Sequence, residues 1–143
     1  MNKLLRIFNG FEIPTYVCFD GDRNTDDSDN KKKTLNLLSL VGSSIDEIEE
    51  IETKVSDDYA ILEHNYEDTL KQEINNYEEL CDKAVDELGP TGKPLKHRYI
   101  ATQLKNKAEN EDITYEEVFP NTIIDIIEKI KSTSYTGSIL YDV

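Results

Sequence analysis

The feature that most constrains this chain is the stretch Thr15–Asp22, TYVCFDGD, in which an apolar run ends in two carboxylates separated by one glycine. Residues 16–19 are β-formers without a polar interruption, which is the pattern of a short strand buried on both faces. Asp20 and Asp22 then fall at the carboxyl end of that strand. The stretch therefore predicts a buried strand that carries a pair of acidic residues at its end.

The two carboxylates are placed where a ligand site is expected. In open α/β sheets, ligands bind at the carboxyl ends of the strands. Alternation along the strand predicts that Asp20 and Asp22 point to the same side, with Gly21 leaving room between them. Two hard oxygen ligands suit Mg²⁺ or Mn²⁺. The alternative interpretation is a strand that runs into an ordinary acidic turn.

The rest of the chain is predicted to alternate between helices and strands. Apolar spacing and helix-start signals predict helices over residues 2–10, 31–41, 66–74, 77–88 and 94–107, with a last helix after Pro120 that buries Ile123, Ile124, Ile126, Ile127 and Ile130. Polar loops are expected over residues 23–30 and 110–112, a capping box over 114–117, a second buried strand over 59–63 and a loose tail over 132–143. This succession is typical of an α/β fold with a parallel sheet.

Composition limits the function. The 143 residues are enough for one domain at most, and 30 acidic against 16 basic residues give a formal net charge of -14. Such a surface repels phosphate backbones unless metal ions or another chain supply positive charge, so the chain alone is not expected to bind DNA. Cys18 and Cys81 form neither a disulfide framework nor a thiolate metal motif, and no apolar run could cross a membrane. We expect a cytoplasmic protein without a membrane partner.

A third carboxylate could complete a metal site. Glu63 and Glu67 both lie where the second strand gives way to a helix, at the same predicted sheet edge as Asp20 and Asp22. Either glutamate is a candidate ligand. For Glu67 there is also a purely structural interpretation, because a negative charge in the first turn of a helix is favoured by the helix dipole.

Lys93 is placed against the helix dipole. A cation at a helix N-terminus costs roughly 0.3 to 1 kcal/mol, so Lys93 gains no stability at that position. An ammonium group beside the backbone N–H groups of a helix start is instead a suitable seat for a phosphate. A solvated lysine after glycine is the alternative, and His64 and His97 are assigned no role.

Two other contexts for an Asp-x-Asp motif are weaker. The opening Asp20-x-Asp22-x-Asn24-x-Asp26 matches the start of an EF-hand calcium loop, but Thr25 replaces its glycine and Lys31 its terminal glutamate. Haloacid-dehalogenase-like phosphatases also place Asp-x-Asp after a strand. The other residues expected of that class are not evident in this sequence.

Three blocks carry a more specific resemblance: residues 13–24 (IPTYVCFDGDRN), 62–70 (LEHNYEDTL) and 92–95 (GKPL). In this order they resemble the later part of the Toprim nuclease domain of the OLD family (overcoming lysogenisation defect), ATPase-linked endonucleases to which the Gabija antiphage nuclease is related. The resemblance spans about residues 3–130 and implies that residues 1–131 are a partial Toprim domain.

The resemblance also implies roles for individual residues. Asp20 and Asp22 correspond to the paired aspartates that hold the metals, which are Mg²⁺ or Mn²⁺. Glu67 resembles the later acidic ligand, with Glu63 in reserve, and Lys93 resembles the active-site lysine of the family. The implied reaction is hydrolysis of a DNA phosphodiester by metal-activated water.

The chain departs from the family in two respects. A complete Toprim domain begins with a strand that ends in a glutamate, whereas this chain begins after that strand, and the ATPase is also absent. The resemblance therefore implies an incomplete parallel sheet flanked by helices and a nuclease that is inactive alone. We expect a homo-oligomer, or an ATPase or nuclease partner chain, with DNA bound only by the completed assembly. The alternative is a non-catalytic acidic interaction module in phage defence or counter-defence.

Overall fold

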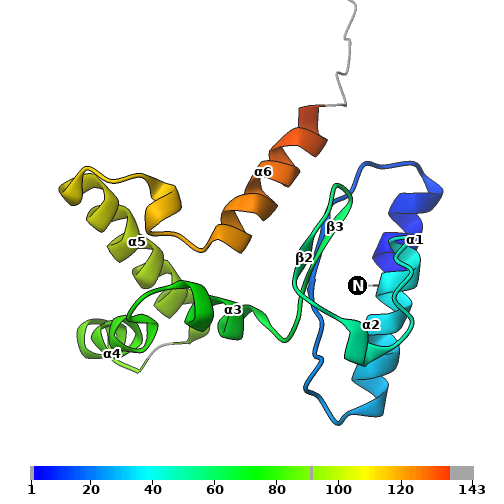
Figure 1. Ribbon diagram of the computed structural model, residues 1–143, viewed down its shortest axis with the longest axis horizontal. Helices are drawn as coiled ribbons and strands as arrows, with labels where there is room; N and C mark the ends of the chain where they lie inside the picture. The colour runs from blue at the N-terminus through cyan, green and yellow to red at the C-terminus, as the bar shows by residue number, and fades with distance from the viewer. Residues whose placement is uncertain (1, 91, 136–143) are drawn as a thin grey trace, which may run out of the picture. The chain divides into compact units, whose positions relative to one another are not determined.

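The computed structural model describes residues 2–90 and 92–135, which form two compact units. The first unit comprises residues 2–66 and 125–135, and the second comprises the described residues of 67–124. The α-helices are α1 (Asn2–Gly10), α2 (Ser28–Leu40), α3 (Tyr66–Glu73), α4 (Tyr77–Leu88), α5 (Lys93–Glu111) and α6 (Asn121–Tyr135) (Figure 1). The strands are β1 (Val17–Asp20), β2 (Lys54–Val55) and β3 (Tyr59–Leu62), and two 3-10 turns are η1 (Ile48–Glu50) and η2 (Tyr115–Glu117).

The first unit contains a three-stranded sheet with the order β1-β3-β2. Strand β1 runs parallel to β3, with Val17 opposite Tyr59, whereas β2 runs antiparallel to β3. The predicted α/β class is confirmed, but the sheet is mixed rather than parallel. The reason is the short connection between β2 and β3, because a tight turn can join only antiparallel strands. In that turn the Ser56 amide and hydroxyl both donate to the Tyr59 carbonyl.

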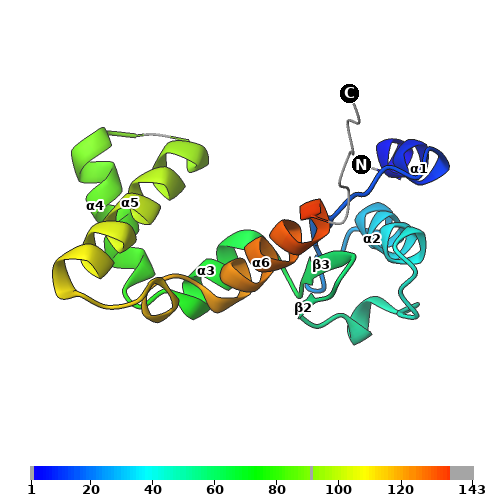
Figure 2. The same cartoon turned by 90° about the horizontal axis from the view of Figure 1, so that it is seen from above.

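Helices α1 and α2 lie side by side on one face of this sheet (Figures 1 and 2). Val17 and Phe19 of β1 are buried with Leu38 of α2 in the core of the first unit, but Cys18 and Asp20 are exposed. The prediction that β1 is buried on both faces is therefore wrong, because the helices cover only the face to which Val17 and Phe19 point. The prediction is right for β3, in which all four residues are buried.

Helix α2 begins three residues earlier than the apolar pattern predicts. The carboxylate of Asp27 accepts hydrogen bonds from the amides of Asp29 (2.8 Å) and Asn30 (3.2 Å), which makes Asp27 the N-cap. The helix ends at Leu40, one residue before the predicted end, and Gly42 follows with a φ of 76°. Residues 28–30 therefore belong to the first helical turn, whereas residues 23–27 form a loop as predicted.

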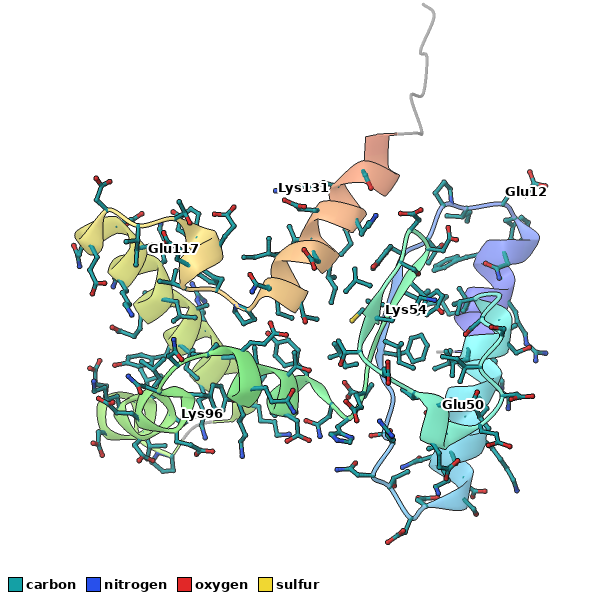
Figure 3. All side chains as sticks on the ribbon, in the orientation of Figure 1. Glu12, Glu50, Lys54, Lys96, Glu117 and Lys131 are labelled. Carbon is teal, nitrogen blue, oxygen red and sulfur yellow. The ribbon has the colours of Figure 1, made fainter. Side chains whose placement is uncertain are left out.

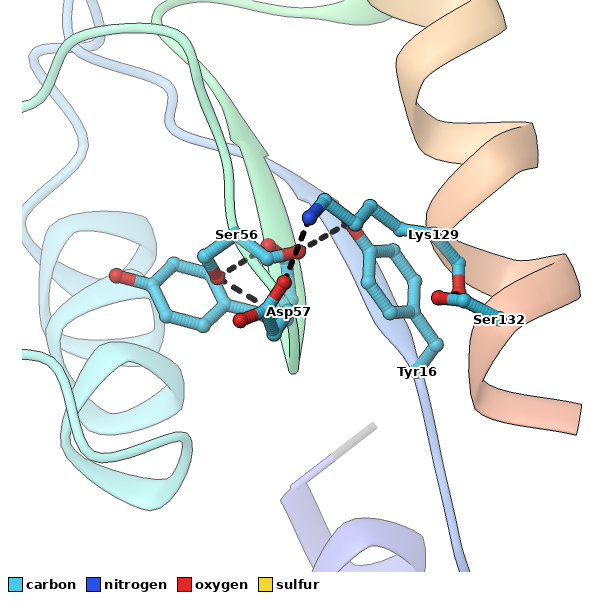
Figure 4. Close-up of polar contacts among 6 residues, drawn as sticks. Tyr16, Ser56, Asp57, Lys129 and Ser132 are labelled. Atoms are coloured by element: carbon cyan, nitrogen blue, oxygen red, sulfur yellow. Dashed lines mark hydrogen bonds and ion pairs between the residues drawn. The ribbon is translucent and has the colours of Figure 1, made fainter. Parts of the chain in front are cut away.

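Polar contacts attach helix α6, the last element of the first unit, to the turn between β2 and β3 (Figure 4). Lys129 of α6 bonds to Asp57 in the β2–β3 turn at 2.6 Å, and the Tyr16 hydroxyl donates to the Ser56 carbonyl at 3.1 Å. Burial, followed by the negative charges nearby, raises the pKa of Tyr16 to about 12. The bond from Lys129 lowers the pKa of Asp57. Through these contacts, Lys129 of α6 and Tyr16 before β1 are both bound to the turn between β2 and β3.

The core of the second unit joins α3, α4 and α5. It is formed by Leu70, Ile74, Tyr77, Ile100 and Leu104. Helix α5 runs to Glu111 instead of ending at about residue 107, because the buried series of α5 continues to Ala108 and the helix stops only where Asp112 adopts a φ of 52°. The predicted capping box is confirmed in η2, where Thr114 and Glu117 bond reciprocally.

Helix α6 buries fewer isoleucines than predicted. Ile126 is buried, but Ile127 and Ile130 are exposed. The helix passes from the second unit to the first between residues 124 and 125, so no single core runs along its whole length. The helix continues to Tyr135, four residues into the expected tail, and residues 136–143 of that tail lie outside the described part of the chain.

Two properties of the surface follow from this arrangement. Acidic side chains such as Glu12 and Glu50 lie on the outside of the first unit (Figure 3). None of the described helices combines the length and the apolar character that a membrane span requires.

Candidate functional site

Acidic residues gather at the carboxyl edge of the parallel pair β1 and β3. Asp20 is the last residue of β1 and lies opposite Leu62, the last residue of β3. Asp22 and Glu63 follow their strands by one or two positions. The first unit therefore places three of the predicted ligand residues at one sheet edge, the part of an α/β fold at which ligands bind.

The turn after β1 is tied to the turn after β3 by backbone hydrogen bonds. The amide of Gly21 donates to the Leu62 carbonyl (2.7 Å), that of Asp22 to the His64 carbonyl (2.9 Å) and that of Arg23 to the Glu63 carbonyl (3.1 Å). Two segments that lie far apart in the sequence are thereby held together at the candidate site.

Asp22 is not part of the strand, so strand alternation does not determine where its side chain points. Its φ is 51°, in the left-handed region that few residues other than glycine adopt. The prediction that Asp20 and Asp22 share a side rested on alternation through Gly21, and that basis fails because β1 ends at Asp20.

Gly21 has a different role from the predicted one. A Cβ atom at this position would lie 2.5 Å from the Leu62 carbonyl oxygen and 2.8 Å from that of Glu63. The glycine therefore allows the backbone of the turn to approach β3 closely, instead of leaving room between two carboxylates.

Asp20 has a structural contact with the next helix. Its Oδ1 accepts a hydrogen bond of 3.0 Å from the amide of Tyr66, the first residue of α3. The first amides of a helix have no partner within the helix, so this carboxylate satisfies one of them. Asp20 is thus held at the start of α3, where the dipole of the helix favours negative charge.

Glu63 has an ion-pair partner that the sequence analysis did not identify. The guanidinium of Arg23 lies 2.6 Å from the Glu63 carboxylate, and each side chain is 36% exposed. The imidazole Nε2 of His64 lies 3.8 Å from the same carboxylate oxygen. The His64 Nδ1 is buried and has no hydrogen-bond partner in the described part of the chain. The only local signal for Arg23 is a basic residue directly after the acidic pair.

Glu67 and Lys93 meet in the second unit. Glu67 is the second residue of α3 and Lys93 the first residue of α5, and their Oε1 and Nζ atoms are 2.6 Å apart. The hydrogen bond from Lys93 lowers the pKa of Glu67, and partial burial opposes that shift. Lys93, which is 75% exposed, is at the helix start as predicted, with Pro94 second rather than first. Its ammonium group already has a carboxylate partner.

Further titratable groups surround this pair. The Tyr77 hydroxyl lies 3.4 Å from the Nε2 of His97, whose charge contributes to the lowered pKa of Glu67. Burial and a hydrogen bond with Cys81 raise the pKa of Tyr77 far above its usual value. The starts of α3, α4 and α5 are therefore linked by polar side chains.

The predicted ligands fit a divalent ion in kind but not in number. Carboxylate oxygens are suitable for Mg²⁺ or Mn²⁺, yet no group of three His, Cys, Asp or Glu side chains within residues 2–90 and 92–135 could hold a metal ion. Asp20, Asp22 and Glu63 belong to the first unit, and Glu67 and Lys93 to the second. In the first unit, Asp20 and Glu63 already accept hydrogen bonds from the protein.

Comparison of the chain with protein-family models, curated proteins and solved structures finds no match. The observations that bear on function are therefore the two groups of side chains, one around Asp20, Asp22 and Glu63 and one around Glu67 and Lys93.

Proposed function

We propose that this chain is a partial Toprim-like domain of a metal-dependent DNA endonuclease, similar to the OLD family, and that another chain completes it. The observation that carries the proposal is the gathering of Asp20, Asp22 and Glu63 at the carboxyl edge of the parallel pair β1 and β3. In this proposal Asp20 and Asp22 would hold Mg²⁺ or Mn²⁺ at the edge of the first unit, and the other chain would supply the remaining ligands. In the second unit, Glu67 is proposed as a further ligand, and Lys93 is the residue proposed to stabilise negative charge on a phosphate.

The isolated chain should have little or no nuclease activity. In-line phosphodiester hydrolysis uses two metal ions that clamp the attacking and the leaving oxygen, and neither unit offers a complete set of ligands among its described residues. The formal net charge of -14 also opposes the approach of DNA. A partner chain must supply both the remaining ligands and positive charge.

The first unit has a surface at which a second chain could dock. Strand β1 is at the edge of the sheet, and a groove of about 230 Å³ beside it is lined by Leu4, Phe8 and residues 15–18, among others. On α1 and just after it, Leu4, Ile7 and Phe11 are exposed, and Phe11 reaches 76%. An unpaired strand edge and an apolar patch are features that proteins normally cover.

A second copy of this chain is one partner to be tested. Lys3 and Arg6 are the only charged residues of α1, and both are basic in a chain whose formal net charge is -14. Acidic side chains of another copy could contact these two residues, but two copies that each carry a net charge of -14 repel each other overall, so contact between copies has to come from the apolar residues. An ATPase or nuclease chain is the other partner to be tested.

A non-catalytic acidic interaction module is the second candidate. It is favoured by the ion pairs Arg23–Glu63 and Lys93–Glu67. In each pair a residue with a proposed catalytic or ligand role is bound to a group of opposite charge. A protein that binds through an acidic surface needs no free lysine and no metal.

Titration calorimetry with Mn²⁺ separates the two candidates. The wild type should bind Mn²⁺ weakly, and Asp22→Asn should bind at least about tenfold more weakly, because a ligand is lost. Asp86→Asn is the matched control: it removes the same charge from an exposed position on α4 and should leave the affinity unchanged. Flat traces for all three proteins would contradict the metal site and favour the interaction module.

A plasmid-nicking assay with Mn²⁺ tests the incomplete site. The purified chain alone should not nick plasmid DNA. If a candidate partner restores nicking, Lys93→Ala in this chain should abolish it. Robust nicking by the chain alone, lost in Asp20→Ala, would show that the site is complete without a different chain.

A further inference from the structure

We infer that Glu63 is a positioning residue rather than a metal ligand, and that its ion pair with Arg23 holds the turn that presents Asp22. The inference rests on the proposed function, because it concerns the same sheet edge. It narrows that proposal by assigning to Glu63 a role that excludes direct contact with the metal.

The turn after β1 has a conformation that its surroundings must hold in place. Asp22 has a φ of 51°, in the left-handed region, which residues with a side chain adopt uncommonly, although aspartate does so more often than most. Gly21 lies so close to residues 62 and 63 that a Cβ atom would clash with their backbone carbonyl oxygens. A turn with these features persists only when its surroundings fix it.

Contacts with the turn after β3 hold the turn after β1 in place. The amides of Asp22 and Arg23 donate to the carbonyls of His64 and Glu63, so the two turns are joined at the level of the backbone. The Arg23 guanidinium then binds the side chain of the same Glu63 at 2.6 Å. One residue pair is thus joined through both backbone and side chains, and it lies directly beside Asp22.

The ion-pair contacts of Glu63 oppose a role as a metal ligand. Its Oε1 lies 2.6 Å from the Arg23 guanidinium and 3.8 Å from the imidazole of His64. A divalent ion on this oxygen would be repelled by the guanidinium charge at short range. None of the ion pairs among the described residues involves Asp22.

A charge exchange tests the inference. We would compare Arg23→Glu, Glu63→Arg and the double variant Arg23→Glu/Glu63→Arg with the wild type. Amide hydrogen exchange of Asp22 and Arg23 is measured without metal, and Mn²⁺ affinity is measured separately. Each single variant places like charges together and should speed exchange of both amides roughly twofold to fivefold, the change expected for a partly exposed ion pair. The double variant should restore both exchange rates and the Mn²⁺ affinity.

The Leu80 amide, which donates to the Asn76 carbonyl in the second unit, is the internal control and should not change in any variant. Glu63→Gln, which can still accept from Arg23, is the mild variant and should retain Mn²⁺ binding. Loss of Mn²⁺ binding in Glu63→Gln with unchanged Asp22 and Arg23 exchange would overturn the inference, because Glu63 would then be a ligand. Failure of the double variant to restore exchange would also overturn it. If the wild type binds no Mn²⁺, the proposed function fails, whereas the exchange data still decide whether the ion pair holds the turn.

Discussion

Gly21 determines how closely the turn after β1 can approach the neighbouring strand. A Cβ atom at this position would lie 2.7 Å from the Ile51 side chain as well as against two backbone carbonyls. Backbone carbonyls in a sheet cannot move aside as the end of a flexible side chain can, so any larger residue must displace the turn.

Gly21→Ala should therefore lower the free energy of unfolding by about 1 to 3 kcal/mol, the usual cost of overpacking a buried position. Gly10→Ala is the matched control, because a Cβ atom there meets nothing within 4 Å. Urea denaturation of both variants and the wild type measures the difference. Equal midpoints for Gly21→Ala and the wild type would show that the turn is looser than described.

The sequence predicts which residues reach the sheet edge but not how they are paired. Asp20 is found at the end of β1 because an apolar run followed by an acidic residue marks a strand end locally. The Arg23–Glu63 pair joins positions 40 residues apart, and no local pattern records such a contact. The Asp22 amide donates to the His64 carbonyl in the left-handed conformation of Asp22. The residues around Asp22 in the sequence do not indicate that conformation either.

At the scale of secondary structure, helix interiors are predicted better than helix starts. The apolar residues of α2 are visible in the sequence, but its first turn is polar and is therefore read as a loop. The Asp27 cap is the signal that was missed. Strand β2 has only two residues, too few to show any periodicity, and for this reason the mixed character of the sheet was not foreseen.

The Asp27 cap makes the stability of α2 dependent on pH. Hydrogen bonds from Asp29 and Asn30 lower the pKa of Asp27. A carboxylate whose pKa is lowered by folding stabilises the protein at a pH above the pKa of the unfolded chain, which is about 4. This stabilisation is lost as the pH falls through the pKa of the folded protein. Asparagine caps a helix about as well without titrating.

We therefore expect the stability difference between the wild type and Asp27→Ala to shrink on acidification from about pH 6 to about pH 3. The difference between Asp27→Asn and Asp27→Ala should stay constant over the same range. Urea unfolding followed by circular dichroism provides both values. A difference between the wild type and Asp27→Ala that does not change with pH would contradict the assigned cap.

At the scale of the whole molecule, the chain forms two units with separate cores. The sequence gives no warning of this division, because the chain passes from one unit to the other inside α3 and inside α6 rather than in a loop. Composition and loop signals mark boundaries only where helices end. The expectation of one domain was based on length, which cannot reveal a boundary within a helix.

Self-association is the prediction that belongs to this scale. Sedimentation velocity should show a concentration-dependent dimer or larger species, because the edge of β1 and the apolar residues of α1 need to be covered. The double variant Leu4→Ser/Ile7→Ser should shift the equilibrium to monomer. Leu95→Ser, at a similarly exposed position on α5, should not. A compact monomer at about 100 µM wild-type protein, near the weak end of specific association, would contradict the prediction.

The second unit is one continuous segment inserted into the first, and this affects the order in which parts of the protein fold during synthesis. Lys129 and Asp57 are separated by 72 positions, and the whole of the second unit lies between them. During synthesis the sheet of the first unit can close once residue 66 has left the ribosome, but its contact with α6 must wait until the insertion has been translated. Contacts between such distant positions tend to form late and to slow folding. The nascent chain therefore passes through a stage in which the first unit has its sheet but lacks its last helix, and in which apolar surface is open to chaperones or to aggregation.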